Sequence, residues 1–208
     1  MAAEVALAAE GALDLAILRR LCAEAGLAPG DAYWGDARRT GKQGMTKQMR
    51  GWAAAASHGR PFLVLRDLDR DAPCAGALRA GLLPNPPPLM VLRIAVRAAE
   101  AWLIADREAL AALLSVRPGA LPAEPDACDD PKAALVAAAA RSRSRAVLTG
   151  IAPRPGAGRP VGPDYTAEMI RFVSRPWSPA RAEAHSPSLA RARRRIGELA
   201  ARLHRGSR

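Results

Sequence analysis

The stretch Pro61–Asp71 constrains the fold of this chain more than any other part of the sequence. It begins with the apolar run Phe62–Leu65, which is typical of a strand buried on both faces of a parallel sheet. Asp67 and Asp69 follow at the carboxyl end of the expected strand, where open α/β sheets bind their ligands. Two carboxylates spaced in this way can bind one hard cation such as Mg²⁺. The same pattern also allows a polar turn that caps the next helix.

The N-terminal segment has the pattern of half a βαβ unit. Residues Glu4–Ala9 are a candidate strand, Glu10-Gly11 a turn, and Leu13–Ala25 an expected helix with leucines at helical spacing. If this strand is parallel to the one before Asp67, Glu10 lies at the same edge of the sheet as Asp67. The alternative is a solvent-exposed glutamate at a helix start, where the helix dipole favours an acid.

Two further acids stand out because their neighbours are apolar. A strand is expected over Leu89–Val96 and a helical segment over Arg97–Asp106, in which Glu100 and Asp106 flank apolar residues. Charged side chains are rarely buried without a partner, so one of these acids is a candidate for a site. The alternative is that both lie on a solvated face of the helix.

The C-terminal part predicts helices rich in basic residues. Lys132 opens an alanine-rich helix, and a cation there opposes the helix dipole, so that either a phosphate contact or a plain surface lysine would account for it. The last helix is expected over Leu189–Leu203 after a cap at Ser186–Ser188. Its arginines form either a nucleic-acid-binding face or the solvated side of an amphipathic helix. The glycine-rich, basic segment 33–46 and the segment 142–162 are expected to be loops.

The charge balance favours an anionic partner. The chain of 208 residues has 31 lysines and arginines against 20 acids, a net charge of +11. Such an excess is typical of proteins that bind nucleic acid. However, only Lys42, Lys47 and Lys132 are lysines, and abundant arginine and alanine are also typical of a GC-rich coding sequence. Aromatic residues make up only 4% of the chain, so alanine and leucine must fill most of the core.

Cysteine use and hydropathy favour a cytoplasmic protein without membrane association. Cys22, Cys74 and Cys128 are widely separated and form no CxxC pair, which argues against a zinc site and a disulfide scaffold. No basic segment followed by a long apolar one marks a signal peptide at the N-terminus. No apolar run approaches the length of a transmembrane helix.

Several familiar sites do not fit the aspartates or the glycines. An EF-hand loop that begins at Asp67 would have Ala72 in place of its glycine and Leu78 in place of its last glutamate. A Walker phosphate loop fails because Gly41-Lys42 is followed by Gln43. A haloacid-dehalogenase-type phosphatase also uses a strand followed by DxD, but the residues after Asp69 fit it poorly. The sequence has no GxSxG nucleophile elbow.

Several motifs together resemble the Toprim domain, which topoisomerases, bacterial primases, small RNA-maturation nucleases and OLD-family nucleases share. These motifs are Glu10-Gly11 with Leu18-Arg-Arg-Leu21, Leu65-Arg-Asp-Leu-Asp69, Arg93-Ile-Ala-Val-Arg97, Glu100-Ala-Trp-Leu-Ile-Ala-Asp106, Pro131-Lys132 and Ser186-Pro187-Ser188. The chain is similar over nearly its whole length to a bacterial Toprim-like family of unknown function related to RloB-type proteins. It departs from the pattern in the first strand, which is poor in valine and isoleucine.

The resemblance implies a fold, an activity and roles for named residues. We expect an α/β fold with a mostly parallel Toprim/Rossmann-like sheet over residues 1–116, and a helical, arginine-rich extension over residues 117–208 that packs on it. The implied activity is Mg²⁺- or Mn²⁺-dependent hydrolysis of phosphodiester bonds in DNA or RNA. Asp67, Asp69 and Glu100 would bind the metal, with Asp106 in a supporting place. Glu10 would be the general acid or base, and Lys132 a catalytic phosphate contact.

The resemblance also implies a biological setting. Similar proteins are encoded beside an ABC-type ATPase in phage-defence operons, and the Toprim protein there is the nuclease effector. The alternative from a different functional class is a non-catalytic adaptor, which would keep the fold and bind nucleic acid or the ATPase without cutting.

Overall fold

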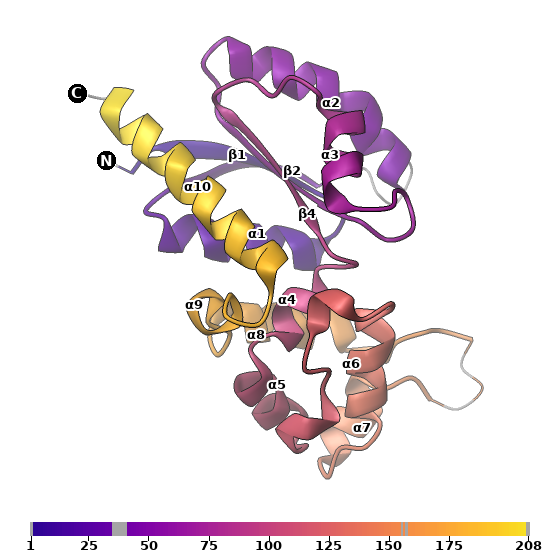
Figure 1. Cartoon of the computed structure of the whole chain (residues 1–208). Coiled ribbons are helices and arrows are strands. Elements are labelled where there is room, and N and C mark those ends of the chain that lie inside the picture. Colours follow the sequence, from indigo (N-terminus) through magenta and orange to yellow (C-terminus); the bar gives the residue numbers. More distant parts are fainter. Residues whose placement is uncertain (1, 35–40, 155, 157, 207–208) are drawn as a thin grey trace. The chain divides into compact units, whose positions relative to one another are not determined.

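The computed structural model describes residues 2–34, 41–154, 156 and 158–206 (Figure 1). The chain forms two compact units. We call Met1–Ala95 with Ala190–Arg208 the sheet unit, and Val96–Leu189 the helical unit. The division therefore falls after the fourth strand and not after residue 116, and most of the last helix groups with the sheet. The reason is that the chain returns to the sheet at its C-terminus, which linear composition does not reveal.

The sheet unit contains four parallel strands in the order β2-β1-β3-β4. Their bounds are β1 Glu4–Ala9, β2 Ala28–Trp34, β3 Phe62–Asp67 and β4 Met90–Ala95. The two inner strands, β1 and β3, pair with Leu7 opposite Leu63, and both of these side chains are fully buried. The expected α/β fold is confirmed, and the sheet is parallel throughout the described residues.

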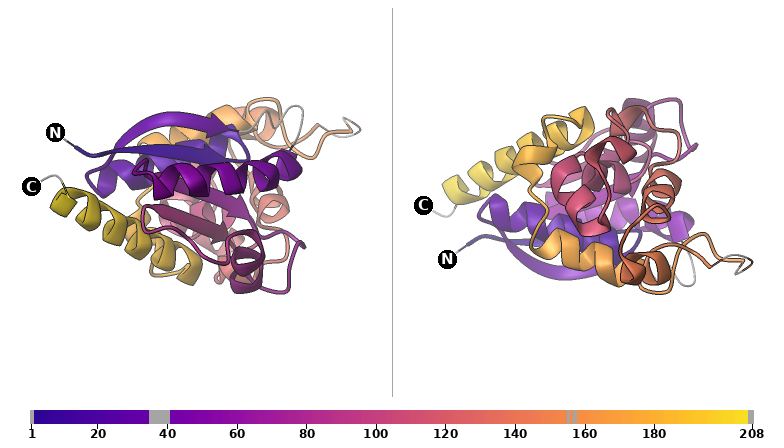
Figure 2. Two further views of the ribbon diagram at one scale, coloured as in Figure 1. Left: turned by 90° about the horizontal axis from the view of Figure 1, so that it is seen from above. Right: turned by 90° about the horizontal axis from the view of Figure 1, so that it is seen from below.

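Helices cover both faces of this sheet (Figures 1 and 2). They are α1 Ala12–Glu24, α2 Gly41–Ser57, α3 Ala75–Leu82 and, for its residues from 190 onward, α10 Pro187–Gly206. On one face, the ring of Trp52 in α2 stacks on Phe62 of β3 at 6.3 Å between ring centroids. On the other face α10 lies beside α1, and Arg193 pairs with Glu24 at 3.4 Å.

The helical unit is built around two buried tryptophans. Trp177 Nε1 donates to the carbonyl of Trp102 at 3.1 Å, and Trp102 Nε1 donates to Ser188 Oγ at 2.7 Å. Both rings are completely buried, and their polar atoms are thereby satisfied. The helices are α4 Glu100–Ile104, α5 Arg107–Leu114, α6 Pro131–Ala139, α7 Arg145–Gly150, α8 Tyr165–Ser174 and α9 Pro179–Ala182, with 3₁₀ turns at Pro118–Ala120 and Pro125–Ala127.

Two segments expected as loops contain regular structure. The helix α2 already begins at Gly41, and strand β2 reaches Trp34, so the expected loop over 33–46 contains parts of both. The expected loop over 142–162 contains α7. In both cases tertiary packing overrides a composition that is typical of loops. No helix among the described residues combines the length and the apolarity needed to cross a membrane.

The start of α10 agrees with the expected serine cap. Leu189 N donates to Ser186 Oγ at 3.2 Å, and Ser186 Oγ donates to Asp126 Oδ1 at 2.7 Å. Asp126 Oδ2 also accepts from Ser188 N at 2.7 Å. Both serines are buried, so this network satisfies polar groups that water cannot reach.

We predict that Ser186→Ala lowers the free energy of unfolding by about 1–2 kcal/mol, because it removes a helix cap and leaves a half-buried carboxylate oxygen short of a donor. Chemical denaturation followed by circular dichroism measures this loss. The matched control is Ser57→Ala at the exposed end of α2, which we expect to change stability by less than about 0.5 kcal/mol. Equal effects of the two substitutions would contradict the network.

Candidate functional site

The carboxyl edge of the two inner strands brings together the acids that the sequence singled out. Glu10 directly follows β1 and Asp67 ends β3, and these strands are neighbours with Ala8 opposite Val64. The carboxylate of Glu10 accepts a hydrogen bond from the backbone N–H of Asp67. Glu10 and Asp67 therefore lie side by side at one edge, which is the arrangement expected for parallel strands.

A tight turn after β3 places the next acids. Leu68 is buried and its N–H donates to the carbonyl of Ala95 at 2.9 Å, while Asp71 N donates back to the Leu68 carbonyl at 3.1 Å. Asp69 takes a positive φ of 43°, a conformation that aspartate tolerates better than most residues other than glycine. The turn keeps the carboxylates of Asp69 and Asp71 at the same edge as Glu10.

The buried guanidinium of Arg66 is the centre of this edge. Its side chain is only 3% exposed, and its Nε lies 2.5 Å from Glu10 Oε1. Nη2 donates to Asp71 Oδ2 at 3.0 Å, and Nη1 donates to Thr46 Oγ1 on α2 at 3.2 Å. One side chain thus joins β1, the turn after β3 and the helix α2.

The ammonium of Lys42 makes a second set of ion pairs. Nζ pairs with Asp69, and it lies 3.1 Å from Asp71 Oδ2. Burial alone would lower the pKa of Lys42, but its hydrogen bonds to the two aspartates outweigh this and raise it. Lys42 is therefore firmly charged at neutral pH.

Glu10 is the acid whose protonation the site changes. Burial, which is the largest effect, raises its pKa above 4.5, and the negative charge of Asp69 acts in the same direction. The positive charges of Arg66 and Lys42 and the hydrogen bond from Asp67 lower the pKa. The net shift is upward. A carboxyl group with a raised pKa next to other acids can give up or accept a proton nearer to neutral pH, as a general acid or base must.

A hollow adjoins the acids. It has a volume of about 710 Å³ and is open to solvent, and α2 supplies most of its lining through Lys42, Gln43, Thr46 and Lys47. Arg66 and Asp71 complete the lining. Lysine and arginine side chains with a hydroxyl between them suit an anionic ligand such as a phosphate group.

The acids fit a divalent metal in their chemistry, since carboxylate oxygens are the ligands that Mg²⁺ and Mn²⁺ prefer. The arrangement of their side chains, however, is not that of a metal site. In the part of the chain that the structure describes, no three acidic, histidine or cysteine side chains are placed to hold one ion. Instead, Lys42 and Arg66 neutralise Glu10, Asp69 and Asp71. A metal would therefore have to compete with these two cations.

Glu100 and Lys132, which the sequence also singled out, pair with each other inside the helical unit. Lys132 Nζ lies 3.2 Å from Glu100 Oε1, and the hydroxyl of Tyr165 donates to the same oxygen at 3.0 Å. The Glu100 side chain is only 4% exposed, so it does not lie on a solvated face of the helix, which was the alternative. In the structure, Glu100 is part of this buried network with Lys132 and Tyr165.

Asp106 has a structural role in the helical unit. Both of its carboxylate oxygens accept from Arg181, at 3.0 and 2.8 Å, and Ser178 N donates to it at 2.7 Å at the start of α9. This bidentate pair uses the acceptor capacity of a buried carboxylate. The basic segment 33–46 also contains Arg38 and Arg39, which lie outside the described residues.

Sequence reasoning missed Arg66 and Thr46. A signal for Arg66 was present, because an arginine inside the apolar run that forms β3 must either reach solvent or find a buried partner. For Thr46 there was none, since its contact with Arg66 depends on how α2 lies over the sheet.

Comparison of the chain with protein-family models, with curated proteins and with solved structures finds no match.

We predict that the stability of the wild type falls relative to that of Glu10→Gln as the pH rises above 4.5. The folded pKa of Glu10 lies above the unfolded value, so its contribution is present below the unfolded pKa and is lost as the carboxyl group ionises. Urea denaturation of both proteins from about pH 4 to 8 measures the difference. A difference that grows in favour of the wild type would mean that Arg66 and Lys42 outweigh burial.

Proposed function

We propose that this protein is a metal-dependent phosphodiester hydrolase that acts on nucleic acid. One observation carries the proposal: Glu10 and the acids of the turn after β3, distant in sequence, meet at the carboxyl edge of a parallel sheet beside a basic hollow. Ligand sites of open α/β sheets lie at this edge. The order of the acids along the chain also supports the resemblance to the Toprim family.

The proposal gives each residue at this edge a distinct role. Asp67 and Asp69 would bind Mg²⁺ or Mn²⁺, and a bound metal would neutralise the charge that develops on the phosphate and help to generate the nucleophile. Glu10, whose pKa is raised, would transfer the proton. Lys42 and Lys47 line the hollow and would contact phosphate oxygens.

Glu100 and Lys132 are left outside this proposed site, because each already has a partner within the helical unit. Metal binding by Glu100 and phosphate binding by Lys132 are inferred from the resemblance and from their positions in the sequence. A role in phage defence and an ABC-type ATPase partner are inferred from the resemblance alone.

A second candidate function has an observation in its favour. Lys42 and Arg66 compensate the carboxylates in the way expected of a structural ion-pair network. A non-catalytic adaptor that binds nucleic acid would keep such a network. The two candidates differ in their response to divalent metal.

We predict that the purified protein, together with a partner if one is required, cleaves DNA or RNA only with Mg²⁺ or Mn²⁺. Asp67→Ala should lower the rate of cleavage at least about 100-fold, because it removes a metal ligand, while binding of the nucleic acid persists. Gel-based cleavage assays measure the rate. The matched control is Asp129→Ala, an exposed acid of the helical unit, which should cut at the wild-type rate. Equal cutting by wild type and Asp67→Ala would remove Asp67 from the site.

We also predict that Lys42→Met increases the affinity for Mn²⁺ several-fold, because it removes the ammonium that competes for Asp69. Isothermal titration calorimetry measures the affinity. Lys47→Met is the control, since Lys47 lines the same hollow but is exposed on α2. An adaptor without a metal site would release no binding heat with either variant.

A further inference from the structure

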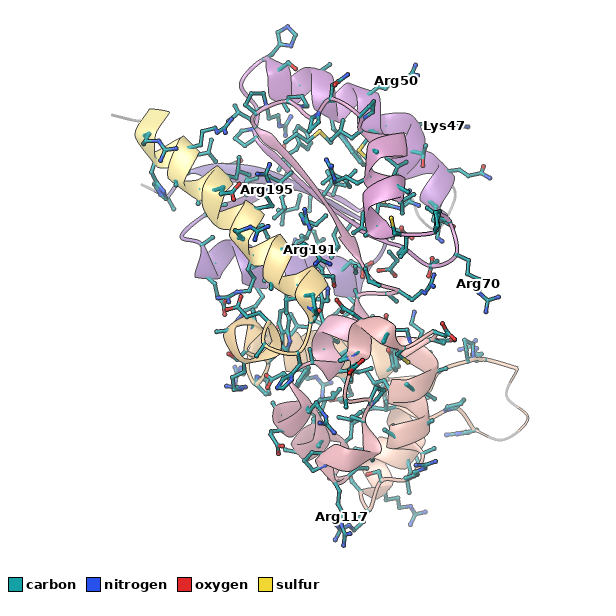
Figure 3. The ribbon with its side chains drawn as sticks, in the orientation of Figure 1. Lys47, Arg50, Arg70, Arg117, Arg191 and Arg195 are labelled. Carbon is teal, nitrogen blue, oxygen red and sulfur yellow. The ribbon has the colours of Figure 1, made fainter. Side chains whose placement is uncertain are left out.

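A second basic region lies in the sheet unit, along the edge strand β4. We call it the arginine strip, and it consists of Arg79 of α3, Arg93 of β4, and Arg191, Arg194, Arg195 and Arg202 of α10. Besides burial, the positive charges of Arg191, Arg79, Arg195 and Arg194 contribute to lowering the pKa of Arg93. Figure 3 labels Arg191 and Arg195 where α10 passes β4.

Arg93 is the unusual member of the strip. Its Nε is buried and has no hydrogen-bond partner. Burial, together with the surrounding arginines, lowers the pKa of Arg93 to about 10, so it still carries its charge at neutral pH. Within the described residues, no acidic side chain forms an ion pair with Arg79, Arg93 or Arg191. A half-buried, charged group among like charges costs stability unless an anion compensates it.

Two simpler explanations account for less of this arrangement. An arginine on an edge strand can protect the edge from pairing with another strand, but such a side chain extends its charge into water. The arginines of α10 could be its solvated face, and Arg194 and Arg195 do share Glu198, at 3.9 and 2.5 Å. Neither explanation accounts for the buried Nε of Arg93 next to arginines that have no acidic partner in the described part of the chain.

Two adjoining hollows lie along the strip. A hollow of about 250 Å³ is lined by Arg79, Arg93 and Arg195 together with apolar residues of β4. A second hollow of about 260 Å³ shares Arg195 with the first and continues to Arg202, and the acid Glu198 also lines it. Residues 191, 195 and 202 are four and seven positions apart, so they lie on one face of α10 over about 16 Å.

We propose that the arginine strip binds the phosphate backbone of a nucleic acid strand. Each hollow is large enough for a phosphate group, and the arginines continue along the helix beyond the first hollow, as a linear polyanion requires and a single phosphate does not. The choice of nucleic acid as the ligand rests on the proposed function. The strip adds to that function a place where the nucleic acid binds outside the acidic edge.

The test measures binding separately from cutting. All variants are made in the Asp67→Ala background, and fluorescence anisotropy follows a labelled single-stranded oligonucleotide of about 20 nucleotides at several salt concentrations. Arg79→Gln and Arg191→Gln should each weaken binding roughly three- to tenfold and should each reduce the salt slope by about 0.7. Arg50→Gln, an exposed arginine of α2, is the control and should change binding less than twofold (Figure 3).

Thermal unfolding is the second readout. Because Arg79 and Arg191 have no ion pair to lose, their glutamine variants should unfold at the wild-type temperature or above it, so weakened binding would not reflect misfolding. Oligonucleotide affinity that is unchanged in both variants overturns the proposal. Inorganic phosphate is compared with the oligonucleotide at equal phosphate concentration. If it raises the unfolding temperature as much as the oligonucleotide does, the site binds a small phosphate compound, and that result would also overturn the proposal. A wild-type protein that binds the oligonucleotide through the strip but does not cut it with Mg²⁺ or Mn²⁺ would overturn only the proposed hydrolase.

Discussion

The sheet unit depends on one buried charge, the guanidinium of Arg66. It is placed on the inner strand β3 and is almost inaccessible to water, so its charge must be balanced by the protein itself. Glu10 and Asp71 supply the charge, and Thr46 and the backbone of Lys42 supply hydrogen bonds. The same interaction that orders the edge thus fixes where its acids lie.

Charge is distributed in two contrasting ways over the sheet unit. At the carboxyl edge the acids and the cations Lys42 and Arg66 compensate each other, so the site is stable without a ligand but its acids are engaged. Along β4 and α10 the arginines outnumber the acids, and the buried Nε of Arg93 has no hydrogen-bond partner among the described residues. The first arrangement suits a site that exchanges one cation for another. In the second arrangement, the proposed binding of a polyanion would reduce the repulsion among the arginines.

The helical unit shows why acids with apolar neighbours are ambiguous in a sequence. Glu100 and Asp106 are both buried, as their neighbours suggested, yet Asp106 serves to hold Arg181 and the start of α9. Asp126, which drew no attention in the sequence, holds the serines at the start of α10. Burial of an acid requires a partner, and that partner can be structural as readily as functional.

Local pattern alone determined much of this protein. The strands β1, β3 and β4, the parallel α/β class, the cap at Ser186 and the meeting of Glu10 with Asp67 all follow from hydrophobic period and from parallel pairing, which act over short distances in the chain. Only the tertiary structure decided that Arg66 and Lys42 engage those acids, and that Arg93 faces the arginines of the last helix. Ion pairs and like-charge clusters join residues remote in sequence, so no local period encodes them.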